Sequence, residues 1–203
     1  MKVAIFGSTN GTDVNYISFA RNNGKLDGID FVFILSNKEK AGILNKAESL
    51  DAKPIYLSGK GKTREQYDEE VSMLLDDHDI DLVLLIGYMR LMTHGFVKRW
   101  YGRVMNIHPS LLPAFAGGMD LNIHEAVLKR GCKYTGATLI FIDEEADTGP
   151  IISQNIVSVS DFDTPETLKN KVQEAEGDLL VEALQAWRAG VINLKENKVT
   201  IRW

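Results

Sequence analysis

The sequence contains a single cysteine, Cys132, so an internal disulfide is excluded, which suits a reducing compartment. No apolar run reaches the length of a membrane span, about eighteen residues, and no apolar segment follows a basic start as in a secretion signal. There is also no stretch dense in Lys and Arg, and the net charge is −5. These absences argue against a membrane protein and against a nucleic-acid or membrane-surface binder. We therefore expect a soluble, cytoplasmic protein.

The glycine-rich motifs GxGxxG and GxxxxGK[ST] are missing, so neither a dinucleotide nor a nucleoside triphosphate is indicated. In their place, an apolar segment, 3–7, leads into a loop of turn formers and helix caps, 8–13, and a helix through about Asn22. Such an opening leaves backbone N–H groups and the positive end of a helix dipole at one spot, which suits a phosphate. Asp13 is an unfavourable neighbour for an anion if its carboxylate faces inward.

Strand-like and helical segments alternate along the chain, and 44% hydrophobic content in 203 residues allows one sizeable core. The alternation predicts an α/β fold with a doubly wound, mostly parallel sheet of about seven strands, followed by a short C-terminal hairpin. The expected strands are 3–7, 31–35, 54–57, 82–86, 103–107, 136–142 and 151–159. The first expected helix ends at about 22. Further helices are expected at 38–49, 63–77 and 123–130, and a long one runs from a cap at 163 or 164 to about 190. The hairpin is expected at 191–203.

The most informative stretch is Met-Asn-Ile-His-Pro-Ser-Leu-Leu-Pro at 105–113. Strand side chains alternate, so Asn106 and His108 are expected on one face of a strand and Ile107 on the other. Pro109 should end that strand. Ligands bind beyond the carboxyl ends of the strands in such sheets, so this polar pair is a candidate active site. The spacing alone fits the polar start of a loop equally well.

Other segments near strand ends are ambiguous by themselves. The segment 87–92 either lines a binding site or packs on the core as a helix entry. His124, at a helix start, is more typical of a cap or a surface residue than of a catalyst. The acidic turn 143–147, with four carboxylates, would normally be a solvated loop, and the loop 114–122 should be mobile or functionally shaped.

Four motifs, in order along nearly the whole chain, resemble the folate-dependent formyltransferase family and its glycinamide ribonucleotide formyltransferase members. They are Asn-Gly-Thr at 10–12, Gly-Tyr-Met-Arg-Leu at 87–91, the block 102–113 and Asp-Thr-Gly-Pro at 147–150. The resemblance implies transfer of a formyl group from 10-formyltetrahydrofolate, a cosubstrate, to the amine of glycinamide ribonucleotide in purine biosynthesis, without a metal. It also implies a single formyltransferase domain, 1–203, whose segment 1–100 binds the phosphate-bearing substrate and whose segment 101–203 serves folate binding and catalysis.

The resemblance assigns catalytic roles that the residues alone left open. Asn106 and His108 would stabilise the oxyanion of a tetrahedral intermediate, and Asp147 would act as base or proton relay. The spacing could not choose Asp147 from the other carboxylates of the turn. A carboxylate near His108 is expected to raise the pKa of the histidine and favour its cationic form.

The resemblance implies binding residues as well. The substrate would be held by Asn10, Gly11, Thr12 and Asp13 at its phosphate and by Glu176 at its ribose. The folate would be held by Met89, Arg90, Leu91, Asn106 and Glu144, with Arg64 at its glutamate tail. For Arg64 and Glu176, a solvated helix face is the alternative.

The chain departs from the family pattern at three places. Asp13 stands where the family usually has Asn, Ile140 stands where many members have His, and the loop 117–121 is longer than in many members. These differences bear on the phosphate site, on the support of the catalytic residues and on substrate access.

Related formyl-transfer enzymes are the nearest rival interpretations. A methionyl-tRNA formyltransferase would need a further C-terminal domain and a basic surface, whereas this chain ends at Trp203 and is acidic. A formyltetrahydrofolate hydrolase would carry a regulatory domain before the first strand, which here starts at Val3. A sugar-amine formyltransferase shares the catalytic residues, and a folate-binding protein without catalysis is the alternative of another class. We expect small-molecule substrates only, no nucleic acid or membrane partner, and a monomer or homodimer.

Overall fold

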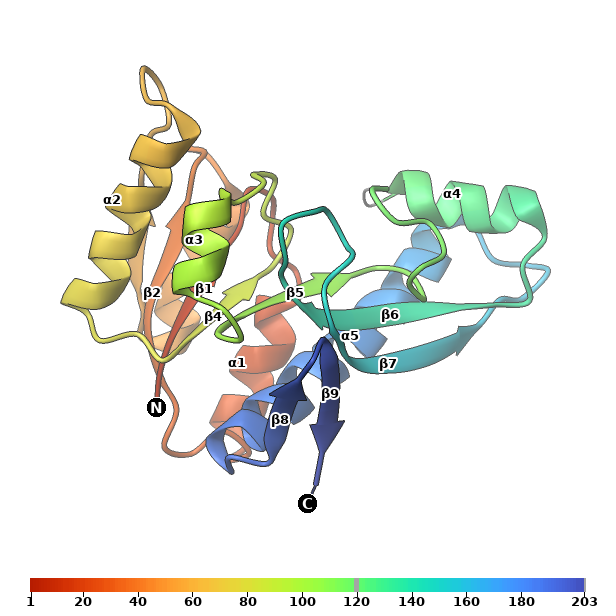
Figure 1. The fold of residues 1–203 in the computed structure, drawn as a ribbon. Coiled ribbons are helices and arrows are strands. Elements are labelled where there is room, and N and C mark those ends of the chain that lie inside the picture. Colours follow the sequence, from red (N-terminus) through yellow and green to blue (C-terminus); the bar gives the residue numbers. More distant parts are fainter. Residues whose placement is uncertain (119–120, 203) are drawn as a thin grey trace.

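The computed structural model describes residues 1–118 and 121–202 (Figure 1). Met119 and Asp120, part of the loop expected to be longer than in many family members, lie outside the described residues, as does Trp203. Seven strands form one sheet in the order β3-β2-β1-β4-β5-β6-β7. The strands are β1 Lys2–Phe6, β2 Asp30–Ser36, β3 Lys53–Tyr56, β4 Leu82–Leu85, β5 Val104–His108, β6 Tyr134–Phe141 and β7 Ile151–Ser158.

The five strands from β3 to β5 run parallel to their neighbours, and β6 runs antiparallel to both β5 and β7. A separate antiparallel hairpin, β8 Ile192–Lys195 with β9 Lys198–Ile201, follows near the C-terminus. The predicted mostly parallel α/β sheet with a C-terminal hairpin is therefore confirmed. The apolar strand segments explain the result, because strands covered on both faces must be apolar on both faces.

Helices cover both faces of the sheet (Figure 1). One hydrophobic cluster joins alternate side chains of the strands to α1, η1 and α5, and a second joins the opposite strand faces to α2 and α3. The helices are α1 Val14–Asn22, η1 Gly42–Leu50, α2 Arg64–Asp77, α3 His94–Arg99, α4 Leu121–Arg130 and α5 Pro165–Arg188. No helix in the described ranges is long and apolar enough to cross a membrane.

Two helical segments differ from the prediction. The expected helix at 38–49 is a 3₁₀ helix that begins only at Gly42, after an extended Ala41. A short helix, α3, occupies 94–99, where no helix was predicted; Thr93 caps it by accepting a hydrogen bond from the N–H of Phe96. Six residues are too few to show a helical hydrophobic period, which is why the pattern did not reveal α3.

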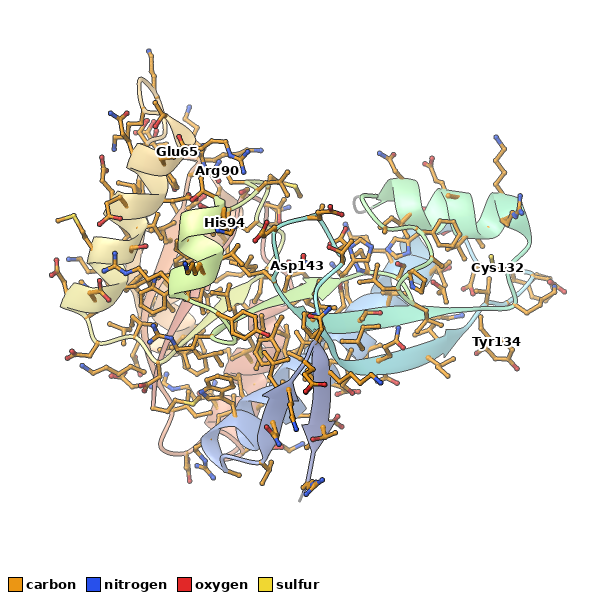
Figure 2. The ribbon with its side chains drawn as sticks, in the orientation of Figure 1. Glu65, Arg90, His94, Cys132, Tyr134 and Asp143 are labelled. Carbon is orange, nitrogen blue, oxygen red and sulfur yellow. The ribbon has the colours of Figure 1, made fainter. Side chains whose placement is uncertain are left out.

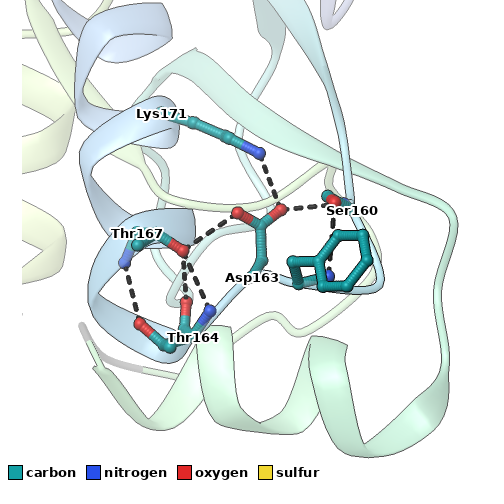
Figure 3. A network of polar contacts seen from close by, with 6 residues as sticks. Ser160, Asp163, Thr164, Thr167 and Lys171 are labelled. Atoms are coloured by element: carbon teal, nitrogen blue, oxygen red, sulfur yellow. Dashed lines mark hydrogen bonds and ion pairs between the residues drawn. The ribbon is translucent and has the colours of Figure 1, made fainter.

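The start of α5 is fixed by a compact polar network (Figure 3). Of the two expected caps, Thr164 is the N-cap, and its capping box is completed by Thr167. The carboxylate of Asp163 instead accepts hydrogen bonds from the Ser160 N–H, the Thr167 hydroxyl and the Lys171 ammonium. The hydrogen bond from Lys171 lowers the pKa of Asp163, so the carboxylate stays charged and the helix start is well determined.

Candidate active site

An open pocket of about 390 Å³ lies beyond the carboxyl ends of β1, β4 and β5. This is the edge where a parallel sheet is expected to bind ligands. The loops after these strands, the acidic turn after β6 and one face of α5 all contribute, so both halves of the chain line the pocket. The lining residues are 9–13, 85–92, 106–109, 117, 118, 124, 140, 142, 143, 145–147, 169, 173 and 176.

Asn106, His108 and Asp147 meet in this pocket. The Asn106 amide Nδ2 donates to Oδ1 of Asp147 at 3.4 Å, and His108 Nδ1 lies 3.4 Å from Asp147 Oδ2. The Gly117 N–H donates to the same Oδ2 at 2.9 Å. The structure therefore brings an amide, an imidazole and a carboxylate within reach of one ligand atom, although two separate segments supply them.

The strand β5 explains how Asn106 and His108 come to share a face. It ends at His108, immediately before Pro109, as predicted. In the antiparallel neighbour β6, Ile140 lies opposite Asn106 and Thr138 lies opposite His108. Ile140 is buried and lines the pocket, so Asn106 has an apolar neighbour at the position where many family members have a histidine.

The chain after β5 is anchored by Thr138. Its hydroxyl donates to the Ser110 carbonyl at 2.6 Å and accepts from the Leu112 N–H at 3.0 Å. Gln154 donates to the Thr138 hydroxyl and to the Leu112 carbonyl, both at 3.0 Å. These buried hydrogen bonds hold the segment that follows His108 against the sheet, and they fix the end of β5.

The electrostatics of His108 differ from the sequence-based expectation. Burial lowers the pKa of the imidazole below its ordinary value, although Asp147 and the Phe115 carbonyl act in the opposite direction. Asp147 thus raises this pKa in the expected direction, but loss of water outweighs that attraction, so the expected preference for the cationic form is wrong. His108 Nε2 has hydrogen-bond geometry to the Phe115 carbonyl oxygen at 3.3 Å, whereas Nδ1 makes only an ion-pair contact with Asp147 at 3.4 Å, so we assign the ring proton of the neutral histidine to Nε2.

The loop after β1 forms one end of the pocket. Gly11 has φ +60°, and a Cβ atom there would lie 2.3 Å from a side-chain carbon of Ile43, so only glycine fits. The Thr9 carbonyl also accepts the N–H of Ile43 at 3.0 Å. Asn10, Thr12 and the buried Asp13 line the same end. The packing of this loop on Ile43 thus depends on the glycine at position 11.

The segment after β4 forms the other end of the pocket. Gly87 has φ +59°, and Met89 donates its N–H to the Ser8 hydroxyl at 2.9 Å. The Arg90 guanidinium lies over the Tyr67 ring, 4.0 Å from its centroid, a cation–π geometry. Met89 and Leu91 are exposed beside it and offer an adaptable apolar surface.

Two predicted binding residues do not line the pocket. Arg64 donates from Nη2 to the carbonyls of Leu91 and Met92, at 3.0 and 3.1 Å. It therefore holds the pocket-lining segment after β4 without lining the pocket itself. Glu144 forms an exposed ion pair with His94 Nδ1 at 2.5 Å. Figure 2 shows Cys132 and Tyr134 at one end of β6 and Asp143 towards its other end. Asn106, Met89, Arg90, Leu91, the residues 10–13 and Glu176 all line the pocket.

Three polar residues that were not among the predicted site residues also line the pocket. His124 is buried and lines the pocket, so the expectation of a surface residue is wrong. Lys169 and Gln173 lie on α5 with Glu176, at positions i, i+4 and i+7 of one helix face. That spacing, counted back from Glu176, is the signal that could have identified Lys169 and Gln173. No group of three or more His, Cys, Asp or Glu in the described ranges is arranged to hold a metal.

Comparison with known proteins identifies relatives that match nearly the whole chain, including the segments that line the pocket. A family model described as formyl transferase matches residues 1–184. The chain is 37% identical over 198 residues to the trifunctional purine biosynthetic protein adenosine-3 of Gallus gallus, covering 97% of this chain and 19% of that protein. It is also 37% identical over 210 residues to the chloroplastic phosphoribosylglycinamide formyltransferase of Arabidopsis thaliana, covering 97% of this chain and 71% of that protein.

Solved structures agree in fold. The phosphoribosylglycinamide formyltransferase of Coxiella burnetii, in complex with CHES, has a TM-score of 0.92 and 32% identity, covering 99% of this chain and 93% of that one. A formyltetrahydrofolate deformylase of Pseudomonas syringae has a TM-score of 0.85 and 28% identity, covering 98% of this chain and 65% of that one. Since proteins named for transfer and for deformylation share the fold, the fold alone does not choose between these reactions.

Proposed function

This chain belongs to the formyl transferase family, and on that basis we propose that it transfers the formyl group of 10-formyltetrahydrofolate to the amine of glycinamide ribonucleotide. The observation that carries the proposal is the meeting of Asn106, His108 and Asp147 in one pocket. The pocket also has a glycine-dependent loop at one end and an apolar, arginine-bearing segment at the other. These two ends suit a phosphate-bearing acceptor and a folate.

Reaction begins when the acceptor amine attacks the formyl carbon and a tetrahedral intermediate with a negative oxygen forms. The Asn106 amide and the Nε2–H of His108 are the donors proposed to stabilise that oxygen, each worth on the order of 10²–10³ in rate. To donate to the ligand, Asn106 would have to give up its hydrogen bond to Asp147, and His108 its hydrogen bond to the Phe115 carbonyl. Because the pocket excludes part of the solvent, such donors act more strongly than in water.

Asp147 is proposed to move the amine proton. Its carboxylate is 13% exposed and faces His108 Nδ1, the ring nitrogen that carries no proton when His108 is neutral. A proton released by the attacking amine can therefore pass to Asp147 or be shared with His108, and return to the nitrogen of the leaving tetrahydrofolate. A positioned base or relay of this kind contributes roughly 10²–10⁴ in rate.

The binding roles follow the two ends of the pocket. We propose that the backbone at Asn10, Gly11 and Thr12 holds the acceptor phosphate and that Glu176 accepts the ribose hydroxyls. The segment Met89 to Leu91 and the turn before Asp147, Glu144 included, are proposed to receive the folate. Arg90 is proposed at the glutamate tail, with Arg64 either beside it or holding the segment that carries it.

We also propose that the enzyme works in the cytoplasm on small molecules, with no nucleic acid or membrane partner, as a monomer or homodimer. Support comes from its acidic balance and its single cysteine. The whole activity is a proposal because the chain spans only 19% of the trifunctional relative's length.

The decisive experiment supplies purified protein with 10-formyltetrahydrofolate and follows its consumption. Rapid consumption only after addition of glycinamide ribonucleotide supports the proposal. Equal consumption in water alone would indicate the hydrolase, and consumption only with an amino sugar nucleotide would indicate a sugar-amine formyltransferase. No consumption with any acceptor would leave a folate-binding protein.

A further inference from the structure

The phosphate end of the pocket carries an unusual concentration of negative charge. Asp13 and Glu176 are buried and line the pocket there. Burial, together with the carboxylates of Glu174, Asp13, Asp178 and Glu176, raises the pKa of the Tyr16 phenol on α1. A phosphate ester that enters this end therefore meets a repulsive field, which weakens its binding unless a cation offsets it.

The position of α5 supplies that cation. α5 packs on α1 so closely that a Cβ at Gly177 would lie 2.4 Å from the Tyr16 ring. About two turns before this contact, Lys169 lines the pocket on the same helix face as Glu176. Among the described lining residues, the one other Lys or Arg is Arg90, whose guanidinium lies over Tyr67.

We propose that Lys169 binds the phosphate of the acceptor and offsets the carboxylates of Asp13 and Glu176. This assignment rests on the proposed function, since it concerns the acceptor of that reaction. An ammonium group adds charge-assisted hydrogen bonds to those of the backbone N–H groups in the loop 10–12. Lys169 contacts the part of the acceptor that does not react, so it acts on binding and on the choice of a phosphorylated acceptor.

At residue 13 this chain has Asp where the family usually has Asn. An Asn at this position would add no charge, whereas the buried Asp13 adds a negative charge beside the phosphate loop. In this proposal Lys169 balances a charge that an Asn at position 13 would not carry. Loss of the Lys169 charge should weaken phosphate binding more than loss of a single hydrogen bond. Removal of the Asp13 charge should then restore part of the lost affinity for phosphate.

The test compares K169Q with a matched control, K171Q, on the same helix. Lys171 lies two residues further along α5 and donates to Asp163 at 2.7 Å, away from the pocket. Binding of inorganic phosphate is measured by calorimetry, and the KM for glycinamide ribonucleotide and kcat are measured by the formyl-transfer assay. We expect K169Q to weaken phosphate binding and to raise this KM by on the order of 10- to 100-fold, with kcat within about twofold of wild type. K171Q should match wild type in all three quantities.

Two further variants separate charge from folding. K169R should recover most of the affinity for phosphate, because it keeps the charge. D13N should strengthen phosphate binding, and the D13N/K169Q double variant should bind phosphate better than K169Q. Melting temperatures close to that of wild type would show that these variants are folded.

The inference is overturned if K169Q binds phosphate as wild type does, or if K171Q loses as much affinity. The two proposals fail separately. If wild type formylates no glycinamide ribonucleotide but its phosphate binding depends on Lys169, the proposed reaction is wrong and the phosphate site stands. If glycinamide ribonucleotide is formylated and K169Q leaves its KM unchanged, the reaction stands and the role of Lys169 is wrong.

Discussion

His108 Nδ1 and Asp147 Oδ2 lie 3.4 Å apart, with the opposite ring nitrogen of His108 directed at the Phe115 carbonyl. With the ring proton assigned to Nε2, a neutral His108 directs the lone pair of Nδ1 at Asp147. The two groups are thus arranged to hold one additional proton between them. This relationship connects the proton relay to the oxyanion donor, because a gain of charge at His108 also strengthens its hydrogen bond to the substrate.

Replacing Asp147 by Asn should lower kcat by roughly 10²–10⁴ and leave the dissociation constant for folate nearly unchanged. The amide keeps the shape of the carboxylate but takes no proton at neutral pH. Steady-state kinetics and folate titration of D147N measure the two effects. D161N is the matched control, since Asp161 is an exposed carboxylate paired with Lys133 at the other end of β6. Near-normal turnover of D147N would remove the relay role of Asp147.

The pKa of His108 should lie below about 6.5, its ordinary value, because burial opposes the charged form. His108 is then mostly neutral at pH 7. Titration of its ring signals by NMR measures the pKa directly. D147N should lower the pKa further, because it removes the attraction that partly offsets burial. A wild-type pKa above 6.5, or a rise in D147N, would contradict this interpretation.

The lowered pKa of His108 also affects the free energy of unfolding. A folded-state pKa below the unfolded-state value means that the unfolded chain takes up the proton first as the pH falls. The contribution of His108 to the free energy of unfolding is therefore constant above the unfolded value, about 6.5, and declines as the pH falls from there to the folded value. Denaturant unfolding of wild type and H108N at several pH values should show a smaller loss in H108N over this window.

The glycine at position 11 should be essential for binding of the acceptor. G11A would place a Cβ 2.3 Å from a carbon of Ile43 and strain the backbone at φ +60°. We expect a raised KM for the acceptor and a loss of stability above the roughly 1–2 kcal/mol of left-handed strain alone. G61A is the control, because Gly61 has φ +77° and a Cβ added there would have nothing within 4 Å. Equal losses in the two variants would mean that the Ile43 contact is unimportant.

Arg64 provides a test between two roles. Its hydrogen bonds to the Leu91 and Met92 carbonyls indicate that it holds in place the segment 89–91, which is proposed to receive the folate. R64A should then raise the KM for formylated folate severalfold, about 3- to 30-fold for one or two charge-assisted hydrogen bonds. The same factor is expected with a formylated pteroate that lacks glutamate. An effect that disappears with this shorter cosubstrate would show instead that Arg64 contacts the glutamate tail.

The sheet was predictable because its signals are local. Continuous apolar segments such as 82–86 indicate strands buried on both faces, and the period of two in β5 placed Asn106 and His108 on one face. Pro109 ended the strand as expected, since it fixes its own backbone and that of the residue before it.

Other features depend on contacts that no local pattern contains. Asp147 reaches His108 from a distant turn, so the spacing could not distinguish it from Asp143 or Glu145. The net shift in the pKa of His108 depends on how deeply the folded chain buries the ring, which the proximity of a carboxylate does not reveal. The helical spacing back from Glu176 could have pointed to Lys169, but its place in the pocket depends on how α5 packs against the loop after β1.

The proposed reaction moves the formyl carbon to an amine, and a ¹³C-labelled formyl group follows that carbon directly. Wild-type protein is mixed with 10-[¹³C]formyltetrahydrofolate and glycinamide ribonucleotide, and the products are observed by ¹³C NMR. We predict that the label appears in a formamide on the glycinamide nitrogen, with little free formate, and that D147N forms this product far more slowly. Label that accumulates as formate at the same rate with and without the acceptor would contradict the proposed transfer.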